Sequence, residues 1–213
     1  MDRFIAALCI TLLTSVQSPA LFADSSGEPK LPIVLTLFLH DELSDQDIRN
    51  LDSDYIGWFT EDLETITQRD VQIIGIRHKA GYTDFDYRLG DADKALYEWD
   101  QRVIDYVIGE QKSRDKRHKY LLITQDDLTF FTRGIASHGK RSAIASMTAY
   151  RTIAHEVGHL LGAKHDDGQL IGTAFPLACD TNMAVKILHI TRDCYKYSDR
   201  AGRVIGHYLN DTP

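Results

Sequence analysis

An eleven-residue run from His155 to His165, HEVGHLLGAKH, constrains this chain more than any other stretch. On a helix with 3.6 residues per turn, His155 and His159 lie four positions apart and face the same side. Neutral imidazoles are good zinc ligands, so one helical turn could present both to a single metal ion. Glu156 follows the first histidine, where its carboxylate could take a proton from a water molecule that the metal activates.

The third histidine requires the helix to end. In a continuous helix His165 would lie roughly 15 Å along the axis from His155, whereas a zinc ligand stands about 2.0–2.1 Å from the metal. The chain must therefore turn between His159 and His165, and Gly162 can adopt a left-handed helix end at little cost. The spacing predicts three protein ligands and an open fourth position, as in catalytic zinc sites. An ordinary helix is the alternative, but it would not need the spaced glycine and third histidine.

The run resembles the metzincin signature, H-E-x-x-H-x-x-G-x-x-H followed by a methionine turn. Asp166 follows the third histidine, which is similar to the adamalysin (ADAM-type) branch. The resemblance implies a zinc endopeptidase acting on protein or peptide substrates, with Glu156 as general base. It also implies an α/β (α+β) fold. This fold has a mostly parallel twisted sheet with one antiparallel edge strand, two long helices, a zinc helix, and a small irregular C-terminal subdomain that ends in a helix.

Residues 179–184 resemble the methionine turn, in which the Met183 thioether would form an apolar floor beneath the zinc. Val185 stands where astacins and serralysins carry a tyrosine, which again favours the adamalysin-like branch. By the same resemblance, Val185, Ile187 and Leu188 would line a side-chain pocket.

Residues 1–23 are typical of a secretory signal peptide, with an apolar core from Phe4 to Val16 that is too short to span a bilayer. Small residues favour cleavage after Ala23, and an uncleaved signal anchor is the alternative. We therefore expect a secreted or periplasmic protein, with no membrane association after signal removal. Residues 24–213 would form the catalytic domain, divided into an upper subdomain (31–165) and a lower one (166–213).

Two cysteines, Cys179 and Cys194, remain once the signal is removed. An even count in an exported protein predicts a disulfide, although two buried thiols are the alternative. Closing a loop of about 15 residues would stabilise the fold by roughly 3 kcal/mol. Because this loop contains the candidate methionine turn, the bridge would hold one wall of the site.

Composition limits the partners. The chain has 213 residues, 43% of them hydrophobic, and a net charge of −7, which argues for an ordinary globular protein and against nucleic acid as a partner. A monomer is expected. Only a short polar lead separates Ala23 from the first predicted strand, and it carries no cysteine that could block the zinc. The enzyme would therefore be made active or be controlled by a separate protein inhibitor.

Strands and helices alternate in the first part of the chain, which predicts crossover units and a mostly parallel sheet. Apolar runs predict strands at 31–39, 71–76 and 120–124. Three- and four-residue apolar spacing predicts helices at 44–68 and 92–112, the second with Leu96, Trp99, Val103, Val107 and Ile108 on its core side.

Two short strands, at 132–137 and 142–147, are predicted just before the zinc helix. The first is similar in position to the antiparallel edge strand with which metzincins hold substrate. Gly134, Ile135 and Ala136 would then contact an extended peptide by β-augmentation, although an ordinary surface hairpin is the alternative. The zinc helix is expected from Ala149 to Leu161 with Thr148 as N-cap, and a last helix is expected at 199–209, capped by Ser198 or Asp199.

Two other functional classes stay open. One is a catalytically idle, zinc-containing binding or toxin-like module, against which the intact Glu156 argues. The other is a zinc amidase that acts on a small or cell-wall substrate.

Overall fold

The computed structural model describes residues 29–172, 178–185 and 191–211. The expected signal peptide and the pocket residues Ile187 and Leu188 lie outside these ranges. Within them, no helix is both long and apolar enough to cross a membrane.

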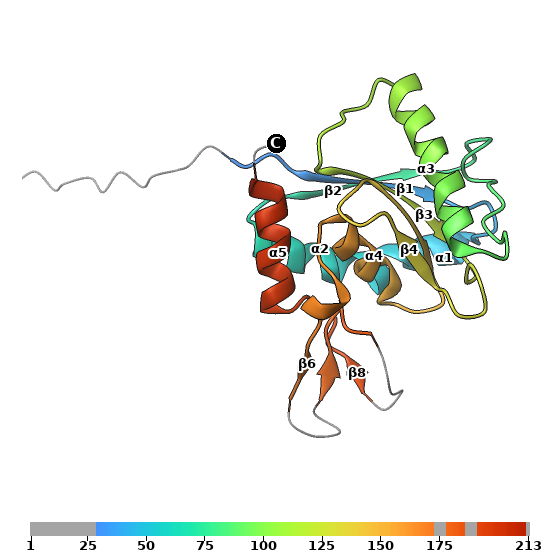
Figure 1. The fold of residues 1–213 in the computed structure, drawn as a ribbon. Coiled ribbons are helices and arrows are strands. Elements are labelled where there is room, and N and C mark those ends of the chain that lie inside the picture. The colour runs from blue at the N-terminus through green and yellow to red at the C-terminus, as the bar shows by residue number, and fades with distance from the viewer. Residues whose placement is uncertain (1–28, 173–177, 186–190, 212–213) are drawn as a thin grey trace, which may run out of the picture.

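A five-stranded sheet in the order β2-β1-β3-β5-β4 forms the centre of the molecule (Figure 1). Four strands run parallel: β1 (Ile33–Leu39), β2 (Val71–Ile76), β3 (His118–Thr124) and β5 (Ser142–Ser146). The last strand, β4 (Gly134–Ala136), is antiparallel to β5 and lies at the edge. This confirms the predicted fold class. The apolar run at 33–39 is buried along its whole length, because β1 lies between β2 and β3 and its side chains pack into hydrophobic clusters on both faces of the sheet.

Helices cover both faces of the sheet. On one face α3 (Ala92–Gly109) packs through Trp99 and Val103, both fully buried. Ile108 is 56% exposed, so its predicted place on the core side was wrong. Val107 faces the sheet, and the next residue lies about 100° further around the helix.

The other face carries the helical stretch that was predicted as one helix from residue 44 to 68. It consists of α1 (Asp45–Asn50), a π-helical segment η1 (Leu51–Ile56) and α2 (Gly57–Thr67), with Ser44 as the N-cap. Leu51 and Ile56 lie five residues apart and are both buried. A π-helical turn brings such a pair to the same face, which an unbroken α-helix would not do.

The zinc helix α4 (Thr152–Leu160) and the last helix α5 (Asp199–Asn210) pack on the same side of the sheet as α2. Ser198 caps α5, as predicted, by accepting a hydrogen bond from the Ala201 backbone. In the chain between α4 and α5, three short strands form a small sheet: β6 (Leu170–Ile171), β7 (Cys179–Asp180) and β8 (Arg192–Asp193). This sheet lies below the main body in Figure 1.

A buried lysine ties three of these elements together. The Lys119 ammonium donates to the carbonyl oxygens of Lys140 (2.6 Å) and Leu160 (2.8 Å) and to the Tyr208 hydroxyl (2.8 Å). It therefore joins β3 to the turn before β5, to the end of α4 and to α5. Burial, and secondarily the nearby Arg141 guanidinium, lower the pKa of Lys119 to about 7.

This lysine should make stability depend on pH. The folded protein releases the Lys119 proton near pH 7, whereas the unfolded chain does so near pH 10.5. Between these values the unfolded state binds more protons, so the free energy of unfolding rises with pH. Relative to Lys119→Met, we expect the unmodified protein to gain about 2 kcal/mol between pH 7 and pH 9 in urea unfolding. Lys94→Met, at an exposed position on α3, should give a profile parallel to that of the unmodified protein. Parallel profiles for all three proteins would contradict the prediction.

Candidate metal centre

The zinc helix starts later than predicted. It begins at Thr152 with Arg151 as its cap residue, so the proposed N-cap at Thr148 was wrong. The Thr148 hydroxyl instead hydrogen bonds to the Asp127 carboxylate and lies 2.8 Å from the Ser146 hydroxyl. These contacts hold the chain in turns between β5 and α4, so the helix cannot form until it is past them.

The chain leaves α4 at Gly162, which has a φ of +88°, a conformation that favours glycine. The Ala163 amide donates to the Gly158 carbonyl (2.9 Å) and the Gly162 amide to the His159 carbonyl (3.0 Å), which closes the end of the helix. The chain then turns back, and His165 begins a short 3-10 segment, η2 (His165–Asp167).

The structure brings His155, His159 and His165 together. Their Nε2 atoms lie 3.1 Å (155–165), 3.2 Å (155–159) and 3.0 Å (159–165) apart. Nitrogen ligands of a tetrahedral zinc ion stand about 2.0–2.1 Å from the metal, and therefore about 3.3 Å from one another. The cluster fits a zinc site with three protein ligands.

Backbone carbonyls set the tautomers of two of these histidines. Nδ1 of His155 lies 2.7 Å from the Asn182 carbonyl oxygen, and Nδ1 of His159 lies 2.8 Å from that of Ala163. A carbonyl can only accept, so each Nδ1 carries the proton. The Nε2 lone pairs are then free and point toward one another, which is the arrangement that a metal ligand requires.

Burial also keeps these imidazoles neutral. It is the main reason that the pKa of His155 falls to about 3, with His159 as the next contribution. Burial likewise lowers the pKa of His159. Two of the three ligands therefore need not lose a proton to bind a metal at neutral pH.

Glu156 lies on the buried side of α4, next to β4. Its side chain is 4% exposed, and burial raises its pKa to about 8. A divalent cation beside it would favour the charged form and lower the pKa again. A Cβ atom at position 134 would stand 2.6 Å from Glu156 Oε1, so only glycine leaves room for this carboxylate against the edge strand. Gly134 was predicted only as a substrate contact, and its sequence gives no sign of this second role.

Met183 packs beneath the helix, in a turn that follows β7. It is fully buried, and a Cβ atom at Gly158 would stand 2.2 Å from its sulfur and 2.9 Å from Tyr197 Cε1. Tyr197 in turn donates a hydrogen bond to the Ala154 carbonyl. Neither Gly158 nor Tyr197 was predicted from the sequence as part of the site. In a helix interior, glycine is about 1 kcal/mol less favourable than alanine. Gly158 in the middle of a predicted helix was therefore a sign that another group packs closely there.

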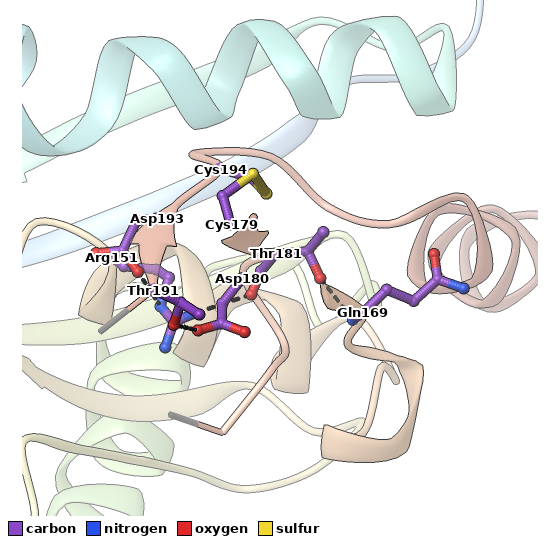
Figure 2. Close-up of a disulfide and its surroundings, with 8 residues drawn as sticks. All are labelled: Arg151, Gln169, Cys179, Asp180, Thr181, Thr191, Asp193 and Cys194. Carbon is purple, nitrogen blue, oxygen red and sulfur yellow. Dashed lines mark hydrogen bonds and ion pairs between the residues drawn. A yellow bond between two sulfur atoms is a disulfide. The ribbon is translucent and has the colours of Figure 1, made fainter. Parts of the chain in front are cut away.

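A disulfide joins Cys179 on β7 to Cys194, just after β8, as predicted (Figure 2). Arg151, the cap residue of α4, reaches the same sheet: it donates to the Thr181 carbonyl (2.9 Å) and lies 3.5 Å from the Asp193 carboxylate. The disulfide therefore stabilises the wall of the site that carries Asn182 and Met183.

The two aspartates after His165 differ in their surroundings. Asp166, on which the adamalysin-like assignment depends, is exposed. Asp167 is buried, accepts from the Lys164 amide (2.8 Å) and lies 2.9 Å from the Arg200 guanidinium. Asp167 thus links η2 to α5, a role that was not predicted from the sequence.

A cavity of about 700 Å³ opens beside the histidines. It is lined by residues of α4, by residues between Asp127 and Gly134, and by Ala184 and Val185, which follow Met183. Of the three predicted substrate-contacting residues, Gly134 lines this cavity, whereas Ile135 and Ala136 pack partly against the core.

Two solved structures have a fold similar to that of this chain. The chain is similar to metalloproteinase-II from Bacteroides fragilis (TM-score 0.58, 20% identity), over 86% of this chain and 54% of that one. It thus spans about half the length of that protein. It is also similar to archaemetzincin from Methanopyrus kandleri (TM-score 0.53, 17% identity), over 84% of this chain and 97% of that one. No protein-family model and no curated protein sequence matches the chain.

Replacing a cluster histidine should remove the metal. We expect the purified protein to hold one zinc ion. His155→Ala, His159→Ala and His165→Ala should each weaken zinc affinity by at least about 100-fold, since substitutions outside the ligand set already lower it 10–100-fold. Metal content after dialysis, measured by plasma mass spectrometry, tests this. His207→Ala, at an exposed histidine on α5, is the control. Full zinc occupancy in all three cluster variants would contradict the assignment.

Two glycine substitutions in helices should change stability in opposite directions. Gly158→Ala should lower the free energy of unfolding by about 1–3 kcal/mol, because the new methyl group overlaps Met183. Gly206→Ala on α5 meets no atom within 4 Å and should raise it by up to about 1 kcal/mol. Urea unfolding of both variants measures the pair, and a stabilised Gly158→Ala would refute the packing argument.

Proposed function

We propose that this protein is a zinc-dependent endopeptidase. The observation that carries the proposal is the convergence of three Nε2 lone pairs on one point, beside a cavity that a buried carboxyl group also lines and an edge strand borders. The similarity in fold to a metalloproteinase and to an archaemetzincin supports it.

When bound, zinc supplies a Lewis acid that makes water more acidic and polarises the scissile carbonyl. The residues of this chain do the rest. Glu156 accepts the proton of the attacking water and passes it to the leaving amine. Its position between α4 and Gly134 leaves the carboxylate little freedom to move, which favours transfer at a fixed point.

The edge strand β4 is the expected platform for the substrate. Its side away from β5 pairs with no other strand in the described part of the chain, so its backbone groups can add an extended peptide by β-augmentation. The required contacts come from the main chain of residues 134–136, so the partial burial of Ile135 and Ala136 does not interfere.

Several finer features belong to the same proposal. We infer an adamalysin-like enzyme from Asp166, and a secreted or periplasmic location from residues 1–23. The Cys179–Cys194 disulfide supports export, because such bonds persist in oxidising compartments. The active protein would be a monomer, controlled by a separate protein inhibitor where control is needed.

The two other classes make different use of the site. An idle binding module would not need the Glu156 carboxyl group to be buried beside the metal, because burying a carboxyl group is unfavourable. An amidase for a small substrate would not need an open cavity of this size beside a free strand edge. Both features favour the endopeptidase.

Cleavage of a broad peptide library tests the proposal. We expect cleavage that stops on addition of a zinc chelator and returns with zinc. Glu156→Gln should lower kcat by at least about 100-fold while zinc content stays unchanged, since removal of a general base typically costs 10²–10⁴-fold. Stoichiometric zinc with no cleavage of any peptide would overturn the endopeptidase and favour the binding module.

A further inference from the structure

Two adjacent phenylalanines project from the loop between β3 and β4. Phe130 is 90% exposed and Phe131 is 91% exposed, the highest values among the large apolar side chains of the described residues. Their rings pack edge to face, with centroids 4.8 Å apart. Contiguous exposed apolar patches often mark interaction sites, so the pair is a candidate for one.

The loop that carries the rings is held in place. The Leu128 amide donates to the Thr132 carbonyl (2.9 Å), and the Thr129 and Thr132 backbones bond to each other across the turn. Leu128 itself is buried, at 3% exposed, and anchors the loop to the core. The rings are therefore presented by an anchored turn.

Both rings line the cavity that contains Glu156 and His165. Val185, which is 55% exposed, lines the same cavity from the segment after the methionine turn. The apolar surface is thus continuous with the catalytic cleft.

The position of the pair along a bound peptide follows from Gly134. A Cβ atom at this glycine would stand 2.6 Å from Glu156 Oε1, so Gly134 lies beside the carboxylate and marks the level of the scissile bond. Phe131 precedes it by three residues, a distance of at most about 10 Å. Antiparallel pairing is slightly more stable per residue than parallel pairing. In an antiparallel peptide, residues beside the start of β4 lie on the C-terminal side of the scissile bond.

We propose that Phe130 and Phe131 form an apolar lip that selects a large apolar side chain two or three positions after the scissile bond. The inference rests on the proposed peptidase function and names a specificity determinant of the same site. Edge-to-face and stacked contacts with an aromatic or branched side chain would bury both rings on binding.

A membrane surface is the other class of partner that exposed aromatic rings can serve. The protein has a net charge of −7, and Asp126 and Asp127 lie close before the pair in sequence. Both features oppose approach to an anionic bilayer. The shared cavity with Glu156 favours the peptide.

The test compares three variants of the zinc-loaded protein on one peptide library. The double variant Phe130→Ala/Phe131→Ala should lose about tenfold or more in kcat/KM for peptides with Phe or Leu at the second or third position after the cut. Peptides with Asp or Ser there should be cleaved as before. Phe130→Leu/Phe131→Leu should restore most of the selectivity. Tyr97→Ala removes an aromatic side chain that is 65% exposed on α3, away from the cavity, and should change nothing.

A binding measurement separates this inference from the proposed function. In a Glu156→Gln background, which should not cleave, fluorescence polarisation measures the affinity for a labelled peptide with Phe or Asp at the selected position. We expect the preference for Phe to disappear with the alanine pair. If wild type cleaves no peptide and the Glu156→Gln background shows no preference, both proposals fail.

If cleavage persists with unchanged preference in the alanine double variant, the lip alone is overturned. If the alanine double variant changes the preference only for residues before the scissile bond, the proposed position of the lip after that bond is wrong. Loss of binding to phosphatidylcholine vesicles with intact peptide selectivity would assign the rings to a membrane instead. The variants should fold normally, since both rings are exposed, and thermal unfolding checks this.

Discussion

The site depends on a reversal of the chain within six residues. A helix can place His155 and His159 on one face, but it carries every later residue away along its axis. The left-handed conformation at Gly162 ends α4 and brings His165 back beside the other two histidines. Their three nitrogen atoms then lie close enough together to bind one metal ion. A side chain at this position would be strained by the backbone conformation and would press against Tyr208. The end of the helix and the zinc site are therefore one feature.

The rest of the centre comes from segments that lie far apart in sequence. Glu156 depends on the absence of a side chain at Gly134 on the edge strand, and the floor beneath the helix depends on Met183 meeting Gly158. The wall that carries Met183 is held by the disulfide and by Arg151, and the end of α4 is held by Lys119 from the central strand. The geometry at the metal is thus a property of the folded domain rather than of the signature alone.

Much of this could be predicted because it depends on local chemistry. The histidine spacing, the glycine and the pair of cysteines define short-range constraints, and the apolar runs define a buried parallel sheet. Contacts between distant segments could not be predicted. Thr148 failed as a helix cap because Asp127, 21 residues earlier, binds its hydroxyl. The π-helical turn at 51–56, the burial of Asp167 and the fully buried Lys119 likewise depend on what packs against them. An ordinary charged or helical residue gives no local sign of such an environment.

The partners of the histidine Nδ1 atoms have an evolutionary consequence. His155 and His159 are oriented by the main-chain oxygens of Asn182 and Ala163. Many metal sites use a carboxylate for this purpose, and a single substitution can then remove it. Here the accepting oxygens belong to the main chain, so a substitution of the Asn182 or Ala163 side chain does not remove them. The histidines keep these partners as long as the backbone keeps its path. The orientation of these two ligands is therefore set by the path of the main chain rather than by the chemistry of a supporting side chain.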